Sequence, residues 1–223
     1  MARKHLLLGC IACGVLTIAP LANSYGDWYV GGSIGQSRID ATADEIEDAF
    51  LIDDDFVATG TTLDKTDTGW KAYAGYQFLP MLGLEAGYAE LGRATFSTTI
   101  VEAPPPADAL TPFSIEGTAT VDGALLAAVL QVALPGPFAF LARAGAFRWQ
   151  AKFTERITDT GMTRVARTES KIDALYGIGA KLQFSDALGA RLEWERLENV
   201  GEGIGGREGR DVDFFSVGVV FEF

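Results

Sequence analysis

Covalent chemistry in this sequence would have to depend on carboxylates, because other reactive side chains are scarce. The single histidine, His5, and both cysteines, Cys10 and Cys13, lie within the first 13 residues. Glu193 and Glu195 stand two residues apart, and a pair of carboxylates is able to hydrolyse glycosides. On a strand, however, these two side chains would follow one another along one face, without an open cleft between them. The sequence therefore predicts a protein that is not an enzyme.

The first 24 residues have the pattern of an export signal that is cleaved. Two basic residues precede an apolar run at residues 6–19, and a small-x-small cleavage site follows shortly after it. We therefore predict a signal peptide at residues 1–24 and one domain at residues 25–223. Cleavage would remove every imidazole and thiol, which excludes histidine-dependent and cysteine-dependent mechanisms. Lipoprotein processing at Cys10 is the alternative, but it would leave almost no apolar segment.

Two further stretches have the form of binding motifs. Residues 201–206 match the Gly-x-Gly-x-x-Gly pattern of nucleotide sites, but they lead into a predicted strand and lack the helix that holds the phosphate. Residues 53–55 are three aspartates, without the alternating ligands and the glycine turn of an EF-hand loop. We therefore predict no cofactor and no metal site. A solvated acidic loop is expected instead, in which residues 43–51 form a short amphipathic helix; weak bridging by divalent ions to anionic lipopolysaccharide is the functional alternative.

The charge balance excludes another class of partner. The chain carries 18 basic and 30 acidic residues, a net charge of −12. Removal of Arg3 and Lys4 with the signal would leave 16 basic against 30 acidic residues, a net charge of −14. A chain this acidic is not expected to bind nucleic acid.

Short segments of alternating side chains must position the remaining polar residues. In residues 211–223, every second position counted back from Phe223 is large and apolar, whereas the intervening positions are mostly small or polar. Side chains alternate across a strand, so this segment is predicted to be a strand with one apolar face. Segments long enough to cross an outer membrane, which takes about 9–11 residues, occur at residues 27–38, 69–79, 81–95, 118–134, 138–153, 169–184, 188–198 and 211–223.

The connections between these segments alternate between long and short. Three short turns, at Pro80, residues 135–137 and residues 185–187, are interleaved with four longer loops. Outer-membrane barrels are built in this way, whereas a soluble lipocalin-like barrel lacks the strict asymmetry. We therefore predict an all-β fold, an eight-stranded antiparallel up-and-down transmembrane β-barrel, with both termini on the side of the short turns. The last strand of a soluble sandwich is the alternative for residues 211–223.

Insertion in a membrane reverses the usual meaning of the two strand faces. Apolar faces meet lipid, and small or charged residues fill the lumen. The charged residues predicted to share this lumen are Glu85, Arg143, Lys181, Arg191 and Glu193. Charges withdrawn from water must be paired or hydrogen-bonded, and eight strands enclose little more than their own side chains. A packed polar plug is therefore favoured over a conducting pore.

Aromatic residues near the strand ends have two predicted roles. An interfacial belt is predicted for all four tryptophans, Trp28, Trp70, Trp149 and Trp194. Phe223, with Phe221 on the same strand face, resembles the signal that the barrel assembly machinery of the outer membrane reads.

Several stretches resemble the transmembrane barrel domain of OmpA-like outer membrane proteins. They are residues 28–32 (WYVGG), 75–80 (GYQFLP), 83–88 (GLEAGY) continuing to 91–93 (LGR), and 190–194 (ARLEW). The resemblance implies that Glu85 and Arg191 occupy the positions of a glutamate and an arginine that pair inside the barrel and close the water path. A second lysine–glutamate pair of the family falls on Gln131 and Lys181 and is absent here. OmpA proteins proper carry a further peptidoglycan-binding domain, an activity that is not implied for this chain.

The predicted function is that of a non-catalytic structural and surface component of the outer membrane. The predicted partners are outer-membrane lipid, lipopolysaccharide and the barrel assembly machinery. Two alternatives remain at this point. One is a small, low-conductance pore, and the other is an adhesin that acts through its acidic and glycine-rich loops.

Overall fold

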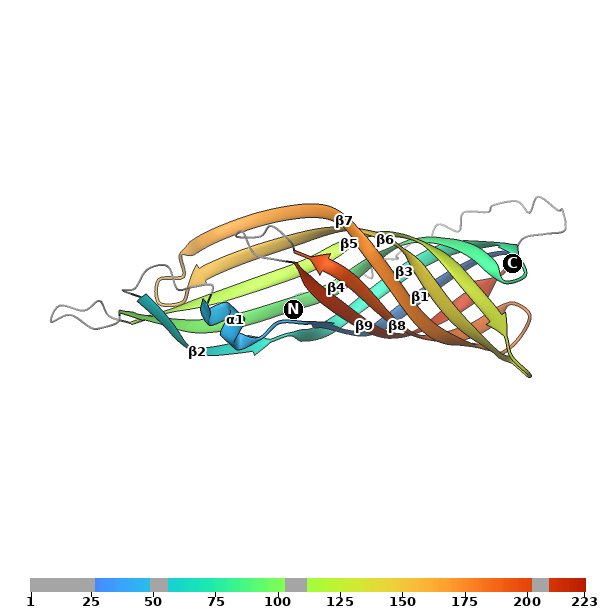
Figure 1. Ribbon diagram of the computed structural model, residues 1–223, viewed down its shortest axis with the longest axis horizontal. Helices are drawn as coiled ribbons and strands as arrows, with labels where there is room; N and C mark the ends of the chain where they lie inside the picture. The colour runs from blue at the N-terminus through green and yellow to red at the C-terminus, as the bar shows by residue number, and fades with distance from the viewer. Residues whose placement is uncertain (1–26, 49–55, 103–111, 202–208) are drawn as a thin grey trace, which may run out of the picture.

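The computed structural model describes residues 27–48, 56–102, 112–201 and 209–223 (Figure 1). Within these residues the chain forms nine strands and one short helix. Their bounds are β1 Asp27–Ile39, α1 Ala43–Asp48, β2 Phe56–Asp64, β3 Thr66–Leu79, β4 Leu82–Glu102, β5 Phe113–Ala133, β6 Phe138–Ile157, β7 Thr163–Gln183, β8 Leu188–Val200 and β9 Arg210–Glu222. No helix in this part of the chain is long and apolar enough to cross a membrane.

Eight of the strands close into an antiparallel barrel. Each strand of the set β1 and β3 to β9 pairs with its neighbour, the β1–β9 ladder joins the first described strand to the last, and the β4–β5 ladder completes the ring. Every predicted segment overlaps one of these eight strands, so the predicted fold is confirmed. β2 was not predicted; it extends the sheet outside the ring by pairing with β4.

The barrel is narrow and strongly staggered. Starting at Tyr29 on β1 and stepping across each ladder leads back to β1 at Ile39. The displacement from residue 29 to residue 39 is a stagger of 10 residues around eight strands. A barrel of this size has an interior just wide enough for side chains to fill.

The strands differ in length, which makes one end of the barrel uneven. β4, β5 and β7 each have 21 residues and β6 has 20, whereas β1, β8 and β9 have 13 and β3 has 14. Figure 1 shows the long strands extending past the short ones at the end that carries α1. We call this end the α1 mouth. Long loops lie at this end, so it is predicted to face the outside of the cell.

The outer surface of the barrel is apolar and its interior contains charges. Lipid-facing side chains such as Leu84, Ile178, Leu192, Val217 and Val219 are between 47% and 65% exposed, whereas the charged side chains of the lumen are buried. A soluble barrel would show the reverse pattern. The predicted assignment of the two faces is therefore confirmed.

Local sequence signals set the turn between β5 and β6 and the start of α1. In the turn between β5 and β6, Gly136 has a φ of 83°, which a residue with a side chain rarely adopts. At α1, the backbone N–H of Thr42 donates to Oε2 of Glu45 at 2.9 Å, and the N–H of Glu45 donates to Oγ1 of Thr42 at 3.4 Å. This reciprocal pair is a capping box, and it begins the predicted helix at Ala43.

Several predictions fall on parts of the chain that lie outside the described residues. These are the signal peptide at 1–24, the end of the predicted helix at 49–51, the aspartates at 53–55 and residues 202–206 of the glycine motif.

Candidate functional site

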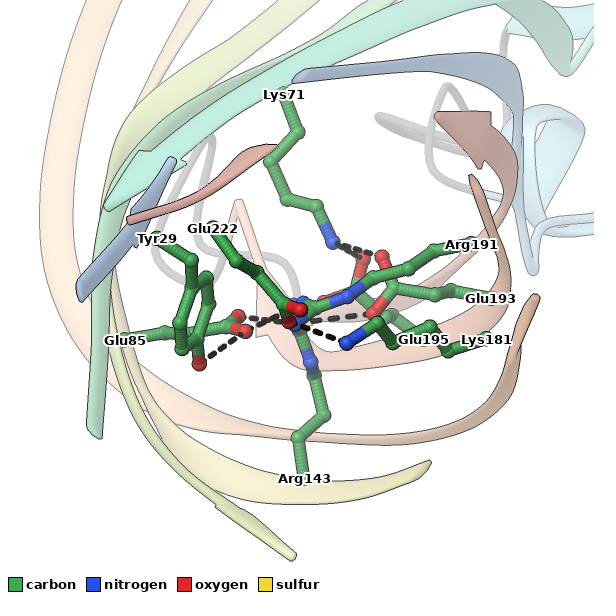
Figure 2. A network of polar contacts seen from close by, with 9 residues as sticks. All are labelled: Tyr29, Lys71, Glu85, Arg143, Lys181, Arg191, Glu193, Glu195 and Glu222. Atoms are coloured by element: carbon green, nitrogen blue, oxygen red, sulfur yellow. Dashed lines mark hydrogen bonds and ion pairs between the residues drawn. The ribbon is translucent and has the colours of Figure 1, made fainter. Parts of the chain in front are cut away.

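Six charged side chains meet in the centre of the lumen, as Figure 2 shows. They come from β3, β4, β6 and β8, and each side chain is at most 4% exposed. Three are cations and three are carboxylates: Lys71, Arg143, Arg191, Glu85, Glu193 and Glu195. We call this set the central cluster. Its formal charges cancel, which a group withdrawn from water requires.

Glu85 binds the two arginines on opposite sides of its carboxylate. Its Oε1 accepts a hydrogen bond from Nη1 of Arg191 at 2.5 Å and another from the hydroxyl of Tyr29 at 2.8 Å. Its Oε2 accepts from Nη2 of Arg143. Both carboxylate oxygens of Glu85 are therefore occupied by donors from three other strands.

Arg143 and Lys71 bind the other two carboxylates between them. Arg143 lies 3.0 Å from Oε1 of Glu193 and donates to Oε1 of Glu195 at 2.6 Å. Nζ of Lys71 donates to Oε2 of Glu193 at 3.0 Å and to Oε2 of Glu195 at 2.5 Å. Each carboxylate of the central cluster therefore contacts two cations, and Arg143 contacts all three carboxylates.

Two tyrosine rings pack against the cations of this cluster. The centre of the Tyr73 ring lies 5.1 Å from the Arg191 guanidinium and 5.4 Å from Nζ of Lys71, and the Tyr29 ring lies 4.9 Å from Arg191. Such cation–π contacts stabilise a cation that has lost its water. The rings fit because Gly31 and Gly75 are opposite them; a Cβ atom at either glycine would collide with a tyrosine ring.

Lys181 forms an ion pair of its own, at the end of the barrel that carries the short turns. The prediction placed Lys181 in one network with the other lumen charges, and the structure separates it from the central cluster. Its Nζ donates to Oε1 of Glu222 on β9, and Nε2 of Gln183 donates to the other oxygen of the same carboxylate at 2.9 Å. The stagger of the barrel brings β7 and β9 side chains together at this level. Glu222 therefore provides Lys181 with a carboxylate, whereas the family position at Gln131 does not.

A layer of apolar side chains fills the lumen between the central cluster and the α1 mouth. It includes Leu91, Leu125, Phe147, Trp149 and Phe214, each at most 6% exposed. Trp149 is completely buried, and its Nε1 donates to Asp173 at 2.7 Å. The predicted place of Trp149 in an interfacial belt is therefore wrong, because Trp149 shares the inward face of β6 with Phe147 and Arg143.

The other three tryptophans lie on the outer surface. Trp28 is 51% exposed and Trp70 is 43% exposed. Trp194 is half-buried and contacts Phe215, and its Nε1 donates to Asp213 at 3.2 Å. Their positions fit a role at the two membrane surfaces.

The geometry of the central cluster is suited to holding the barrel together and not to catalysis. A general acid or base needs access to a substrate, but the carboxylates of the cluster are buried and bound by cations. Among the described residues, no group of three or more histidine, cysteine or acidic side chains is arranged to hold a metal ion.

Several members of the lumen network were not predicted from the sequence: Lys71, Tyr29, Tyr73 and Glu222, together with the role of Glu195 as a partner of Arg143. Inward parity marks each of them. Lys71 and Tyr73 alternate on the inward face of β3 and Glu193 and Glu195 on that of β8, whereas Tyr29 is in phase with the buried positions of β1 and Glu222 with those of β9.

Comparison with known proteins identifies the same family by a family model and by individual relatives. A family model described as the OmpA-like transmembrane domain matches residues 23–223. Outer membrane protein A of Yersinia pseudotuberculosis is 27% identical, over 100% of this chain and 56% of that protein. Outer membrane protein A of Klebsiella pneumoniae is 25% identical, over 94% of this chain and 54% of that protein. The chain thus spans about half the length of the curated relatives it matches.

Among solved structures, the outer membrane protein OprG from Pseudomonas aeruginosa is similar, with a TM-score of 0.52. The match covers 89% of this chain and 96% of that chain at 12% sequence identity. At this identity the similarity shows the barrel fold alone.

Proposed function

The chain belongs to the family of OmpA-like transmembrane domains and is a β-barrel of the outer membrane, and we propose that it acts there as a structural and surface component with a plugged lumen. The plug has two layers, the central cluster and the apolar layer above it. No chemical step is part of this function.

The observation that carries the proposal is the complete pairing of the buried charges in the central cluster. Lys71, Arg143 and Arg191 bind Glu85, Glu193 and Glu195 through contacts from four strands. A hydrated ion would have to separate these pairs in order to pass. Breaking one buried pair costs roughly 3–5 kcal/mol, so passage through several pairs would be very slow.

The apolar layer supports the same proposal. Leu91, Trp149 and Phe214 are each at most 4% exposed. Their side chains fill the lumen where they lie, and an ion gains no hydrogen bonds from them. A continuous water path would therefore have to displace both a charged and an apolar layer.

The surface of the barrel supports the proposed partners. Lipid surrounds the exposed apolar side chains, and the aromatic residues at both ends contact the membrane surfaces. Lipopolysaccharide is the proposed partner on the outer leaflet. The barrel assembly machinery is the proposed reader of Phe223, whose ring contacts Phe221 at a centroid distance of 5.1 Å.

A vesicle-swelling experiment tests the proposed plug against the alternative of a pore. Vesicles that contain the purified barrel are moved into an isotonic solution of a small sugar, and swelling is followed by light scattering. A plugged barrel is expected to swell no faster than empty vesicles. Swelling that increases with the amount of barrel would replace the proposed function with that of a pore.

A further inference from the structure

A cavity of about 150 Å³ lies in the α1 mouth, between α1 and the long strands β4, β5 and β6. The short strands β1, β8 and β9 end at this level, and the residues at these ends, Ile39, Val200 and Val212, line the opposite side of the cavity. α1 lies at this end and packs through Ile46 against side chains of β2, β4 and β5. The cavity is the space that remains between the helix and the tall wall of the barrel.

Apolar side chains form almost the whole surface of this cavity. Val121, Val200 and Val212 belong to the buried apolar layer and form the floor, and Phe96 and Phe153 line the walls. Ile46 of α1 also lines it and is only 8% exposed, because it packs against Phe96 and other side chains of β2, β4 and β5.

Two charged residues line the cavity, and they bind each other. Nη1 of Arg210 on β9 donates to Oε1 of Glu45 on α1 at 2.9 Å, and both side chains are partly exposed. This ion pair connects the helix to the short side of the barrel. The charge is therefore neutralised at the rim, and the interior presents no charged partner to a ligand.

The cavity is separate from the plug that defines the proposed function. Its floor is the apolar layer, and the central cluster lies beyond that layer. A molecule in the cavity would therefore enter and leave through the α1 mouth alone. It would displace poorly hydrogen-bonded water from an apolar surface, which favours binding of an apolar molecule.

We propose that this cavity binds a small, uncharged, apolar molecule about the size of a single aromatic ring. An apolar cavity of about 150 Å³ in another protein is known to stay dry and to bind benzene, which sets the scale for the ligand. Aromatic walls at Phe96 and Phe153 add favourable ring contacts. A charged or strongly polar molecule would lose its hydration without gaining hydrogen bonds.

Methyl NMR of the whole barrel in lipid nanodiscs tests the proposal, with toluene as the probe. Ile46 reports on the cavity, whereas Ile178, which is 52% exposed on the lipid-facing surface, reports on partitioning into the membrane. We expect the Ile46 methyl signal to shift and saturate as toluene is added, while the Ile178 signal drifts without saturation. Equal, unsaturated responses at the two residues would overturn the proposal.

Filling the cavity provides a second test. Ala151→Leu on β6 and Ala119→Leu on β5 each add a side chain to the wall, and Ala144→Leu on the outer face of β6 is the matched control. A folded barrel is heat-modifiable, which means that its unboiled and boiled samples migrate differently on a gel. Each filled variant that remains heat-modifiable is expected to bind toluene at least about tenfold more weakly, because overpacking removes the space. Unchanged binding in a folded filled variant would overturn the proposal.

The size of the ligand gives a test that needs no variant. Naphthalene has two fused rings and exceeds the space for a single ring. The two ligands are compared at equal free concentration in water. We expect the Ile46 shift to require at least about tenfold more naphthalene than toluene for half-saturation, because a packed cavity expands only at a cost. Equal or tighter binding of naphthalene would show that Ile46 reports a general apolar surface and would overturn the proposed site.

Discussion

Nη1 of Arg191 on β8 lies 2.5 Å from Oε1 of Glu85 on β4, although these strands are not neighbours in the barrel. The two side chains meet across the lumen, and both are at most 1% exposed. Only a narrow barrel allows such a contact. The pair therefore connects opposite walls and closes the space between them.

Replacing Arg191 should destabilise the barrel. Arg191→Ala leaves Glu85 with Arg143 as its remaining cation, and loss of one partner from a buried pair costs roughly 3–5 kcal/mol. Water entering the space left by the arginine would reduce this loss. The free energy of unfolding, measured in urea with lipid vesicles present, is expected to decrease accordingly.

The double variant Glu85→Gln with Arg191→Gln serves as the control for charge. It removes both charges together, so part of the lost stability should return. A double variant that is less stable than Arg191→Ala would contradict the view that uncompensated charge causes the loss.

Lys71→Met should cause a loss of the same order as Arg191→Ala. Glu193 and Glu195 both keep Arg143 as a partner, but the cluster is left with one uncompensated negative charge, while the methionine preserves most of the side-chain volume. We expect a loss of roughly 3–5 kcal/mol, the range for removing one partner of a buried ion pair. Lys152→Met, at an exposed position on β6, is the matched control and should leave the unfolding free energy unchanged. An equal loss of unfolding free energy in the two variants would show that Lys71 does not stabilise the plug.

Strand alternation alone is enough to predict the eight barrel strands and the inward direction of Glu85 and Arg191. The reason is that parity is a local property, which each strand displays in its own sequence. The same rule applied strictly places Trp149 inside, because it is six residues from Arg143 on one strand. The prediction of a belt position depends on nearness to a strand end, and that criterion ignores the face.

Partner choice inside the lumen is not a local property. Lys181 contacts Glu222 because the stagger of the barrel brings β7 and β9 to one level there. Sequence alone gives the inward residues of each strand but not the register between distant strands. The helix α1 was predictable from its capping box, whereas the cavity beneath it depends on how far four strands extend past the others.

Phe223→Ala should slow assembly with little effect on the finished barrel. Phe223 is 67% exposed, so the folded state loses few contacts, while the proposed assembly signal loses the aromatic ring of Phe223. We expect several-fold slower appearance of the heat-modifiable form after synthesis in cells. Phe215→Ala, on the lipid-facing side of β9, is the control. Slowing of both variants to the same extent would mean that any lipid-facing phenylalanine of β9 has this effect.

Acid should loosen the start of α1. The Thr42 backbone N–H, and to a smaller extent Arg210, hold the pKa of the Glu45 carboxyl below its usual value. Because the folded pKa is depressed, the stabilisation is present above the ordinary glutamate pKa and is lost as pH falls through the folded value. The amide signal of Thr42 is expected to shift with a midpoint below that of an unperturbed glutamate, and Glu45→Gln should abolish the shift. A titrating Thr42 signal in Glu45→Gln would assign the effect to another group.

Single-channel recording in planar lipid bilayers tests the plug most directly. The variants to compare with the wild-type barrel are Arg191→Ala and, as a control on the same strand, Arg196→Ala, whose side chain is 30% exposed and pairs with Asp213. The wild-type and Arg196→Ala barrels should pass almost no current, and Arg191→Ala should conduct measurably more. If Arg191→Ala is heat-modifiable and yet conducts no more than the wild type, the lumen is not closed by the Glu85–Arg191 pair.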